Sequence, residues 1–225
     1  MGLFSKSKSK EAEAAEDAPP SEDWTLPSYS DATGAPPAPA LEFHAYAQGG
    51  MINQNLTITG ADKQRILYFL KHPTSWTGKW DLTLRQQGLD GPEVAKISKK
   101  AIKDSFQVVL ASDGQLNAVK KSSLWTQKFE FTGNNGTERY TFQPDGRFAR
   151  IYCWSLYKVS EMELPKEQRK VIAHWRTPDW AVSKNGTLKI QPDHAFEQDL
   201  ILAVVLGVQL SGSEERTTTA VLAAT

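Results

Sequence analysis

The residues that could carry catalysis are few in this chain. It has four histidines, His44, His72, His174 and His194, and a single cysteine, Cys153. No pair of histidines has zinc-ligand spacing, and no nucleophile elbow, phosphate-binding loop or dinucleotide fingerprint occurs. Cys153 lies among strand-like aromatic residues, which favours a small buried side chain over a nucleophile, although pairing with His174 stays open. We expect no enzyme activity, no catalytic residue, no metal and no cofactor.

Basic residues offer a different chemistry, the attraction of anionic surfaces. Each Lys contributes about 1 kcal/mol near an anionic membrane, so only several lysines that face the same way would act. For any single lysine, a solvated loop charge that blunts a strand edge is the alternative. The candidates for lipid binding are Lys96, Lys99, Lys100, Lys103, Lys120 and Lys121.

The charge of the chain is divided between its two parts. Residues 1–40 hold three Lys and seven Asp or Glu, a net charge of −4, whereas residues 41–225 hold 23 basic and 19 acidic residues, a net charge of +4. This imbalance supports contact with an anionic surface but is too small for a nucleic-acid-binding protein.

The first ten residues, MGLFSKSKSK, are similar to a lipidated membrane anchor. Removal of Met1 would expose Gly2 for myristoylation, and Lys6, Lys8 and Lys10 would supply membrane electrostatics. The pattern departs from the usual motif, which has Ser or Thr where this chain has Lys6. The alternative is a basic, soluble terminus.

A second short motif, LPSY, spans Leu26 to Tyr29. Leu26, Pro27 and Tyr29 are similar to Pro-x-Tyr ligands of WW domains, in which a stiff extended segment docks into an aromatic groove. The usual pattern has Pro where Leu26 stands, and a plain linker is the alternative. A WW domain of a ubiquitin ligase is the expected reader.

Composition predicts a tail and one folded domain. Residues 1–40 are rich in Ala, Pro, Ser and acidic residues without hydrophobic periodicity, so we expect them to be disordered. Residues 41–225 are long enough for one domain. With one cysteine and no apolar signal segment at its start, the protein is expected to be cytoplasmic, with peripheral association with the plasma membrane or an internal membrane.

Hairpin signals dominate the domain. Asp-Gly or Asn-Gly pairs at 90, 113, 135, 145 and 185 each separate stretches rich in aromatic and β-branched residues. A two-residue loop at Asn135-Gly136 would place Phe131 opposite Tyr140 and Phe129 opposite Phe142. Further strands are predicted at 55–59, 65–71, 80–86, 93–98, 106–111, 147–157, 170–176 and 187–191. Residues 147–157 alternate bulky with small side chains, and an inward small face would leave room inside a barrel.

The segment from Asp193 to Ser213 differs from the rest, because Leu200 to Val208 are all apolar or Gly. Nine residues span about 14 Å of helix, too short to cross a bilayer. Pro192-Asp193 suits a helix start and Gly212 a position just beyond its end, while a last β-strand is the alternative. A helix apolar on all sides needs a closed barrel around it. Its expected core residues are Phe196, Leu200, Ile201, Val204, Val205 and Val208.

A series of hairpins followed by FEQDLILAVVLGVQL resembles the tubby C-terminal-domain-like superfamily, which includes tubby proteins, phospholipid scramblases and LURP-one-related proteins. The resemblance implies a mainly β fold: a closed antiparallel barrel of about twelve strands around a hydrophobic C-terminal α-helix. It also implies a non-enzymatic module that works at membranes, where tubby proteins bind phosphoinositides.

We therefore expect a peripheral membrane protein that binds anionic lipid or acts as an adaptor, without a transmembrane span and without nucleic acid. One alternative is a cytosolic scaffold that recruits a WW-domain ubiquitin ligase through Leu26 to Tyr29. Another is a carrier of a small ligand with an open barrel cavity.

Overall fold

The structure of the protein is a computed structural model, which describes residues 38–48, 55–71, 79–100, 105–122, 127–145, 153–177 and 184–223. Side chains are described within these ranges except at positions 184, 185 and 212–223. Predictions at Gly2, Lys6, Lys8, Lys10, Leu26, Pro27, Tyr29 and Lys103 lie outside the described residues.

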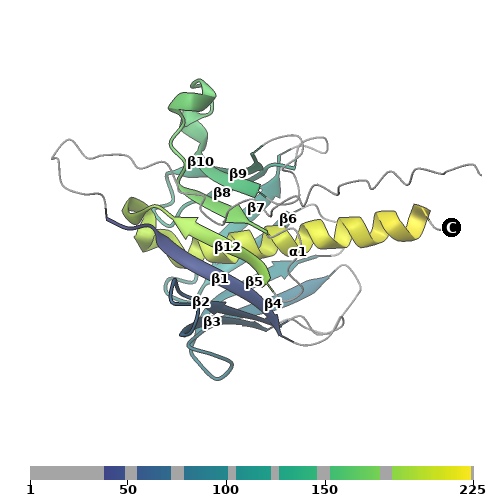
Figure 1. The fold of residues 1–225 in the computed structure, drawn as a ribbon. Helices are drawn as coiled ribbons and strands as arrows, with labels where there is room; N and C mark the ends of the chain where they lie inside the picture. Colours follow the sequence, from purple (N-terminus) through teal and green to yellow (C-terminus); the bar gives the residue numbers. More distant parts are fainter. Residues whose placement is uncertain are drawn as a thin grey trace, which may run out of the picture.

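Twelve antiparallel strands form a closed barrel (Figure 1). Each strand pairs with its neighbours in sequence, and β1 pairs with β12 to close the ring. The strands are β1 (Leu41–Gln48), β2 (Asn55–Thr59), β3 (Ile66–Lys71), β4 (Trp80–Gln86), β5 (Glu93–Lys99), β6 (Ser105–Leu110), β7 (Leu116–Lys121), β8 (Phe129–Thr132), β9 (Arg139–Pro144), β10 (Cys153–Lys158), β11 (Ala173–Arg176) and β12 (Lys184–Ile190). The predicted fold class is confirmed.

The inner face of the wall follows from the two-residue period of the strands. In β4, Trp80, Leu82 and Leu84 are buried, whereas Asp81 between them is exposed. The predicted pairing of Phe129 with Phe142 and of Phe131 with Tyr140 is confirmed.

The turn between β8 and β9 is longer than predicted. Its ladder ends at the pair Thr132 and Arg139, and Gly136 N donates to Gly133 O inside the loop. The Asn135 side chain accepts hydrogen bonds from the amides of Thr137 and Glu138. This Asx turn explains why the loop is larger than a two-residue turn.

Within the described ranges, three short 3-10 helices, η1 (Val159–Glu161), η2 (Lys166–Gln168) and η3 (Pro192–Glu197), precede one long helix, α1 (Gln198–Ala223). α1 runs through the barrel, and its C-terminal end emerges beyond the strands (Figure 1). Every residue from Leu200 to Val208 is buried. The hydrophobic segment is therefore the helical core of the barrel, as the sequence predicts.

Space for α1 comes from small residues on both helix and wall. A Cβ atom at Gly207 would lie 2.5 Å from the ring of Phe106, so only glycine fits against this aromatic residue. Ala95 and Ala173 on the wall are also fully buried. The expectation that β10 turns its small face inward is wrong, because Trp154 and Leu156 join the core.

Two expectations about the helix are corrected. α1 continues past Gly212 to Ala223, which is possible because a glycine within a helix costs only about 1 kcal/mol relative to alanine. Phe196, expected in the core, is 66% exposed. It lies in η3, where the next residue, Glu197, points into the protein instead.

Candidate functional site

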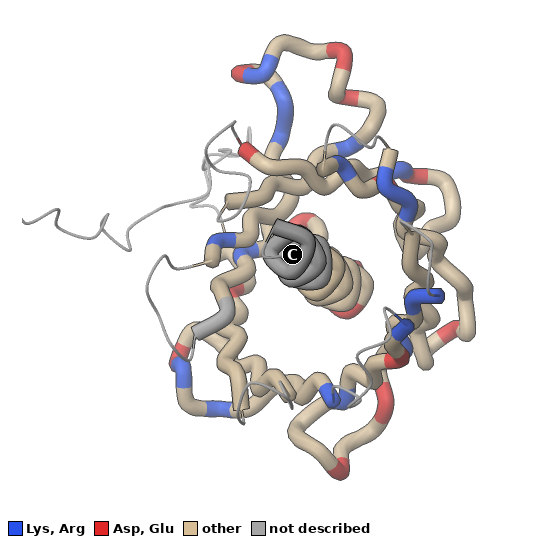
Figure 2. The backbone as a smooth tube through the Cα atoms, turned by 90° about the vertical axis from the view of Figure 1, so that its right-hand side faces the viewer, with Lys and Arg blue, Asp and Glu red and all other residues tan. Residues whose placement is uncertain are grey.

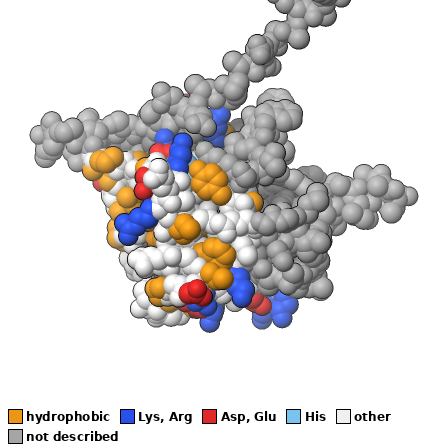
Figure 3. All heavy atoms as spheres, turned by 60° about the horizontal axis from the view of Figure 1, so that its bottom comes forward, with side chains coloured by type: hydrophobic (Ala, Val, Ile, Leu, Met, Phe, Trp, Pro, Cys, Tyr) orange, Lys and Arg blue, Asp and Glu red, His pale blue; other side chains and the backbone are white. Residues whose placement is uncertain are grey.

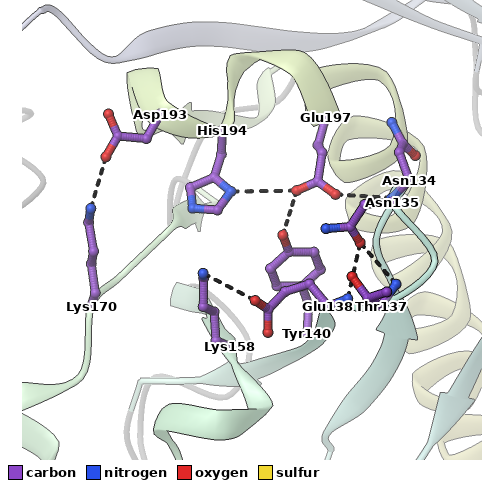
Figure 4. Close-up of polar contacts among 10 residues, drawn as sticks. All are labelled: Asn134, Asn135, Thr137, Glu138, Tyr140, Lys158, Lys170, Asp193, His194 and Glu197. Atoms are coloured by element: carbon purple, nitrogen blue, oxygen red, sulfur yellow. Dashed lines mark hydrogen bonds and ion pairs between the residues drawn. The ribbon is translucent and has the colours of Figure 1, made fainter.

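The most buried polar cluster lies where α1 begins (Figure 4). Glu197 is fully buried, and its carboxylate accepts a hydrogen bond from Tyr140 Oη at 2.6 Å and from the amide of Asn134 at 3.0 Å. His194 Nδ1 lies 3.5 Å from the same carboxylate. A Cβ atom at Gly133 would lie 2.3 Å from Glu197 Oε1, so this glycine permits the close approach.

These contacts keep Glu197 ionised. Burial raises the pKa of Glu197, but hydrogen bonds from His194, Tyr140 and the Asn134 amide outweigh it, so the pKa lies below its usual range. Burial and the hydrogen bond to Glu197 raise the pKa of Tyr140. The cluster therefore holds a charged carboxylate in a fixed position.

A second anchor holds α1 from the other side. Tyr68 Oη on β3 donates to Asp199 Oδ1 at 2.6 Å, and burial followed by this hydrogen bond raises the pKa of Tyr68. Tyr140 is on β9, and β9 and β3 are six strands apart in either direction around the twelve-stranded ring. The two tyrosines thus bind the start of α1 from opposite walls, which is a structural role.

The candidate nucleophile and base lie on the outer face of the barrel. Cys153 is opposite Arg176 and Ser155 is opposite His174, so Cys153 and His174 are diagonal neighbours. His174 Nε2 lies 2.6 Å from Asp145 Oδ2. The described residues also contain no group of three or more His, Cys, Asp or Glu that could hold a metal ion.

Basic residues gather at one rim of the barrel. In a meander, the loops between β1 and β2, β3 and β4, and every second hairpin thereafter lie at the same rim. α1 emerges at this rim, because Gly207 lies against Phe106 near the start of β6, whereas Glu197 contacts the β8–β9 loop at the other rim. We name as the basic rim the residues Lys71, Lys79, Lys99, Lys100, Lys120, Lys121, Lys128 and Arg176.

The basic rim surrounds the emerging helix. Figure 2 shows Lys and Arg positions around the ring that encloses α1. Lys99 pairs with the inward residues Trp80 and Phe106, so it lies at the barrel mouth. The described acidic residues at the strand ends of this rim are Asp81, Glu130 and Asp145. Asp145 is bound to His174 and Glu130 to Arg139, and Glu130 lies opposite Lys120 in the ladder.

The rim contains four of the six predicted lipid-binding lysines: Lys99, Lys100, Lys120 and Lys121. Lys96 lies farther along β5 and forms an ion pair with Glu93 at 3.3 Å, so it is not a rim residue. Lys71, Lys79, Lys128 and Arg176 were missed in the sequence because they are isolated there. Each of them stands at or next to the end of a strand, and this shared position is the signal in the sequence that could have identified them.

The opposite rim has a different character. Ile66, Leu89, Leu116 and Phe196 lie there and are 40–66% exposed. On the side wall of the barrel, drawn in Figure 3, hydrophobic side chains stand among polar and charged ones. Basic residues such as Lys63, Arg65 and Arg139 also lie at this rim, but acidic residues, among them Asp62, Glu138 and Asp193, lie between them, so its charge is mixed.

Comparison of the chain with protein-family models, with curated proteins and with solved structures finds no match. The tubby-like character of the fold therefore rests on its shape, a closed barrel of twelve antiparallel strands with a C-terminal helix. No described helix is both long enough and apolar enough to cross a membrane.

Proposed function

We propose that this protein is a non-enzymatic member of the tubby C-terminal-domain-like superfamily that binds anionic membranes through its basic rim. The observation that carries the proposal is the gathering of eight Lys and Arg residues, from separate parts of the sequence, around the mouth from which α1 emerges. A single Lys contributes about 1 kcal/mol near an anionic leaflet, so several that face one plane give useful affinity.

The rim suits a membrane better than a compact ligand. Lys71, Lys100 and Lys120 are exposed and form no ion pair with the described residues, so their charge is available. Positions spread around a ring match a flat, diffuse anionic surface. A myristoyl group on Gly2 would add a second membrane signal, since one acyl chain alone binds only marginally.

Two alternatives remain as proposals of lower rank. Recruitment of a WW-domain ubiquitin ligase through Leu26, Pro27 and Tyr29 would make the protein an adaptor at the membrane. A small-ligand carrier is less favoured, because the barrel interior that it would use holds the fully buried residues of α1.

The test is vesicle flotation of the full chain produced in bacteria, which lack N-myristoylation of this kind. Vesicles contain phosphatidylcholine alone, or with about 30 mol% phosphatidylserine, or with phosphoinositide of equal total charge. We expect binding only to the anionic vesicles, and weaker binding at higher salt. Stronger binding to phosphoinositide than to phosphatidylserine would indicate headgroup recognition.

The decisive variant is the double substitution Lys71→Glu and Lys100→Glu, which removes about 2 kcal/mol of attraction and should weaken binding about 30-fold or more. The matched control, Lys63→Glu with Arg65→Glu, makes the same charge change at the opposite rim. Equal loss in both variants would contradict a role for the basic rim. A third variant, Leu89→Ser with Phe196→Ser, should bind normally; its failure to bind would assign the membrane to the opposite rim.

A further inference from the structure

The barrel wall has its shortest seam between β7 and β8. Two register pairs join the described residues of these strands, Lys120 with Glu130 and Lys121 with Phe129. By contrast, β7 pairs with β6 at five positions and β8 with β9 at four. The part of β7 before Lys120 and the part of β8 after Glu130 have no register partners across the seam.

Backbone groups of β7 point toward this seam. Alternate residues of an antiparallel strand direct their N–H and C=O groups to the same side. Because Ser122 N donates to Lys128 O, the even-numbered residues Ala118 and Leu116 direct theirs toward β8. These are positions at which an extended peptide can add hydrogen bonds to a strand edge.

A groove of about 740 Å³ follows the seam, between residues 115–122 and the β8–β9 hairpin. Asn117 lines it from the inner face of the wall, on the same side of β7 as Val119; it is 3% exposed, and its Nδ2 atom has no hydrogen-bond partner. A buried amide donor without a partner is unfavourable, so an acceptor on a bound molecule would satisfy it. This unpartnered donor distinguishes the groove from an ordinary surface depression.

The charged groups of the groove favour an acidic ligand. Lys120 is exposed and forms no ion pair with the described residues, and Lys121 lies beside it. Arg139 binds Glu130 at 2.6 Å across the hairpin, so these two charges offset each other. Leu116 and Ala118 add exposed apolar surface. The groove therefore fits an extended peptide with acidic side chains.

We infer that this groove binds the protein's own acidic segment, Glu11 to Asp23. The segment contains six acidic residues and no basic one, whereas residues 41–225 have a net charge of +4. In an extended chain, Glu11 and Glu13 lie on one side and Ala12 and Ala14 on the other. The acidic side would face Lys120, and the Asn117 amide would donate to a backbone carbonyl.

The tether is long enough. The seventeen residues between Asp23 and Leu41 span up to about 60 Å when extended. From β1, six strand spacings lead to β7, a path of roughly 40 Å around a barrel with tilted strands. A tether of this length gives an effective concentration in the millimolar range, so even a weak site is occupied.

Lys120 and Lys121 belong to both the groove and the basic rim. Occupied by the acidic segment, they are unavailable to a membrane, so the docked segment would weaken membrane binding. This consequence rests on the proposed function, whereas docking of the segment does not.

The test is paramagnetic relaxation in the full chain. A nitroxide is attached at Ala14→Cys in a Cys153→Ser background, and amide signals are compared before and after reduction of the label. We expect the signals of Leu116, Ala118 and Thr132 to lose at least two thirds of their intensity, while Thr57 on the opposite wall is unaffected. Lys120→Glu should restore the signals, and Lys63→Glu, the matched control, should not.

Each other outcome overturns the inference. Uniform broadening over both walls, no broadening at the groove, or equal effects of Lys120→Glu and Lys63→Glu would exclude specific docking. To test docking between copies, a spin-labelled chain at natural isotope abundance is mixed with an isotope-labelled chain that carries no nitroxide. If the isotope-labelled chain then shows the full loss of signal intensity at the groove, the intramolecular contact is excluded. Because Lys71→Glu with Lys100→Glu leaves the groove residues intact, failure of docking and failure of membrane binding are separable.

Discussion

The substitution Tyr140→Phe tests whether the start of α1 is held by a buried charged hydrogen bond. The change removes one oxygen, and with it the 2.6 Å hydrogen bond to the fully buried Glu197. A hydrogen bond to a charged group contributes about 1.5–3 kcal/mol, because the buried carboxylate loses a donor that water cannot replace. We expect the free energy of unfolding to fall by about 2 kcal/mol and Tm by about 4–8 °C.

The pH dependence separates this mechanism from a packing effect. Glu197 has a lowered pKa, so its stabilising contribution is present above the unfolded value of about 4.3 and is lost as pH falls through the lower folded value. Tyr140→Phe removes one of the interactions that lower the pKa, while burial still raises it. The difference in unfolding free energy between wild type and variant should therefore be largest near pH 7 and shrink below about pH 4.

Urea unfolding followed by tryptophan fluorescence, at several pH values, measures both quantities. Tyr46→Phe is the matched control: Tyr46 lies on β1, no hydrogen bond of its hydroxyl to the described residues is found, and the expected change is below about 0.5 kcal/mol. A double-mutant cycle with Glu197→Gln should give a coupling free energy of about 1 kcal/mol or more. A loss below 0.5 kcal/mol for Tyr140→Phe, or a loss that does not change with pH, would refute the reasoning.

Three further predictions concern the same core. Gly186→Ala places a Cβ atom 2.1 Å from the ring of Trp175, so chemical denaturation should show a loss of about 1–3 kcal/mol or more, and an unchanged midpoint would contradict this contact. Leu206→Ala, at a 1% exposed position on α1, should cost about 2–5 kcal/mol, and a smaller cost would mean that the barrel collapses around the helix. The raised pKa of Tyr68 means that stability falls as pH rises above about 10, and Tyr68→Phe should reduce this alkaline loss in the same unfolding assay.

The parts of the fold that could be predicted from the sequence are those set by periodicity. The alternation of aromatic and polar residues around Asn135 fixed the pairing of Phe129 with Phe142, because a shift of one residue would turn the aromatic face outward. The unbroken apolar run from Leu200 to Val208 likewise required cover on all sides, which only a closed wall supplies.

The polar anchors could not be predicted, because they depend on which side chains the barrel brings together. Glu197 and Asp199 carry a visible signal as acidic residues at a helix start. No feature of the neighbouring sequence identifies Tyr140 as the partner of Glu197 or Tyr68 as the partner of Asp199, since 57 residues separate the first pair and 131 the second. Phe196 was misplaced for a related reason: the 3-10 segment before α1 changes the direction in which the side chain points.

The candidate site was predictable only in part. Clusters such as Lys99-Lys100 and Lys120-Lys121 stand out in the sequence, and both lie at the basic rim. Lys71 and Arg176 are single basic residues at strand ends, and they join the rim only because every second loop of the meander lies at that end. The groove between β7 and β8 has no signal in the sequence, because a shortened ladder depends on how two strands diverge.

Because β1 and β12 close the ring, β1 cannot pair with its partner strand until nearly the whole domain has been translated. His44 on β1 meets Thr187 on β12 across 143 residues of chain, which a ribosome adds in roughly 7–30 s. During that interval the open edge of β1 and the apolar inner surface of the growing sheet have no partner, because α1, which covers that surface, is translated after all twelve strands. Until α1 has left the exit tunnel, a nascent chain of this design exposes an unpaired strand edge and apolar surface, both of which favour aggregation, and a premature stop before α1 would leave that surface uncovered.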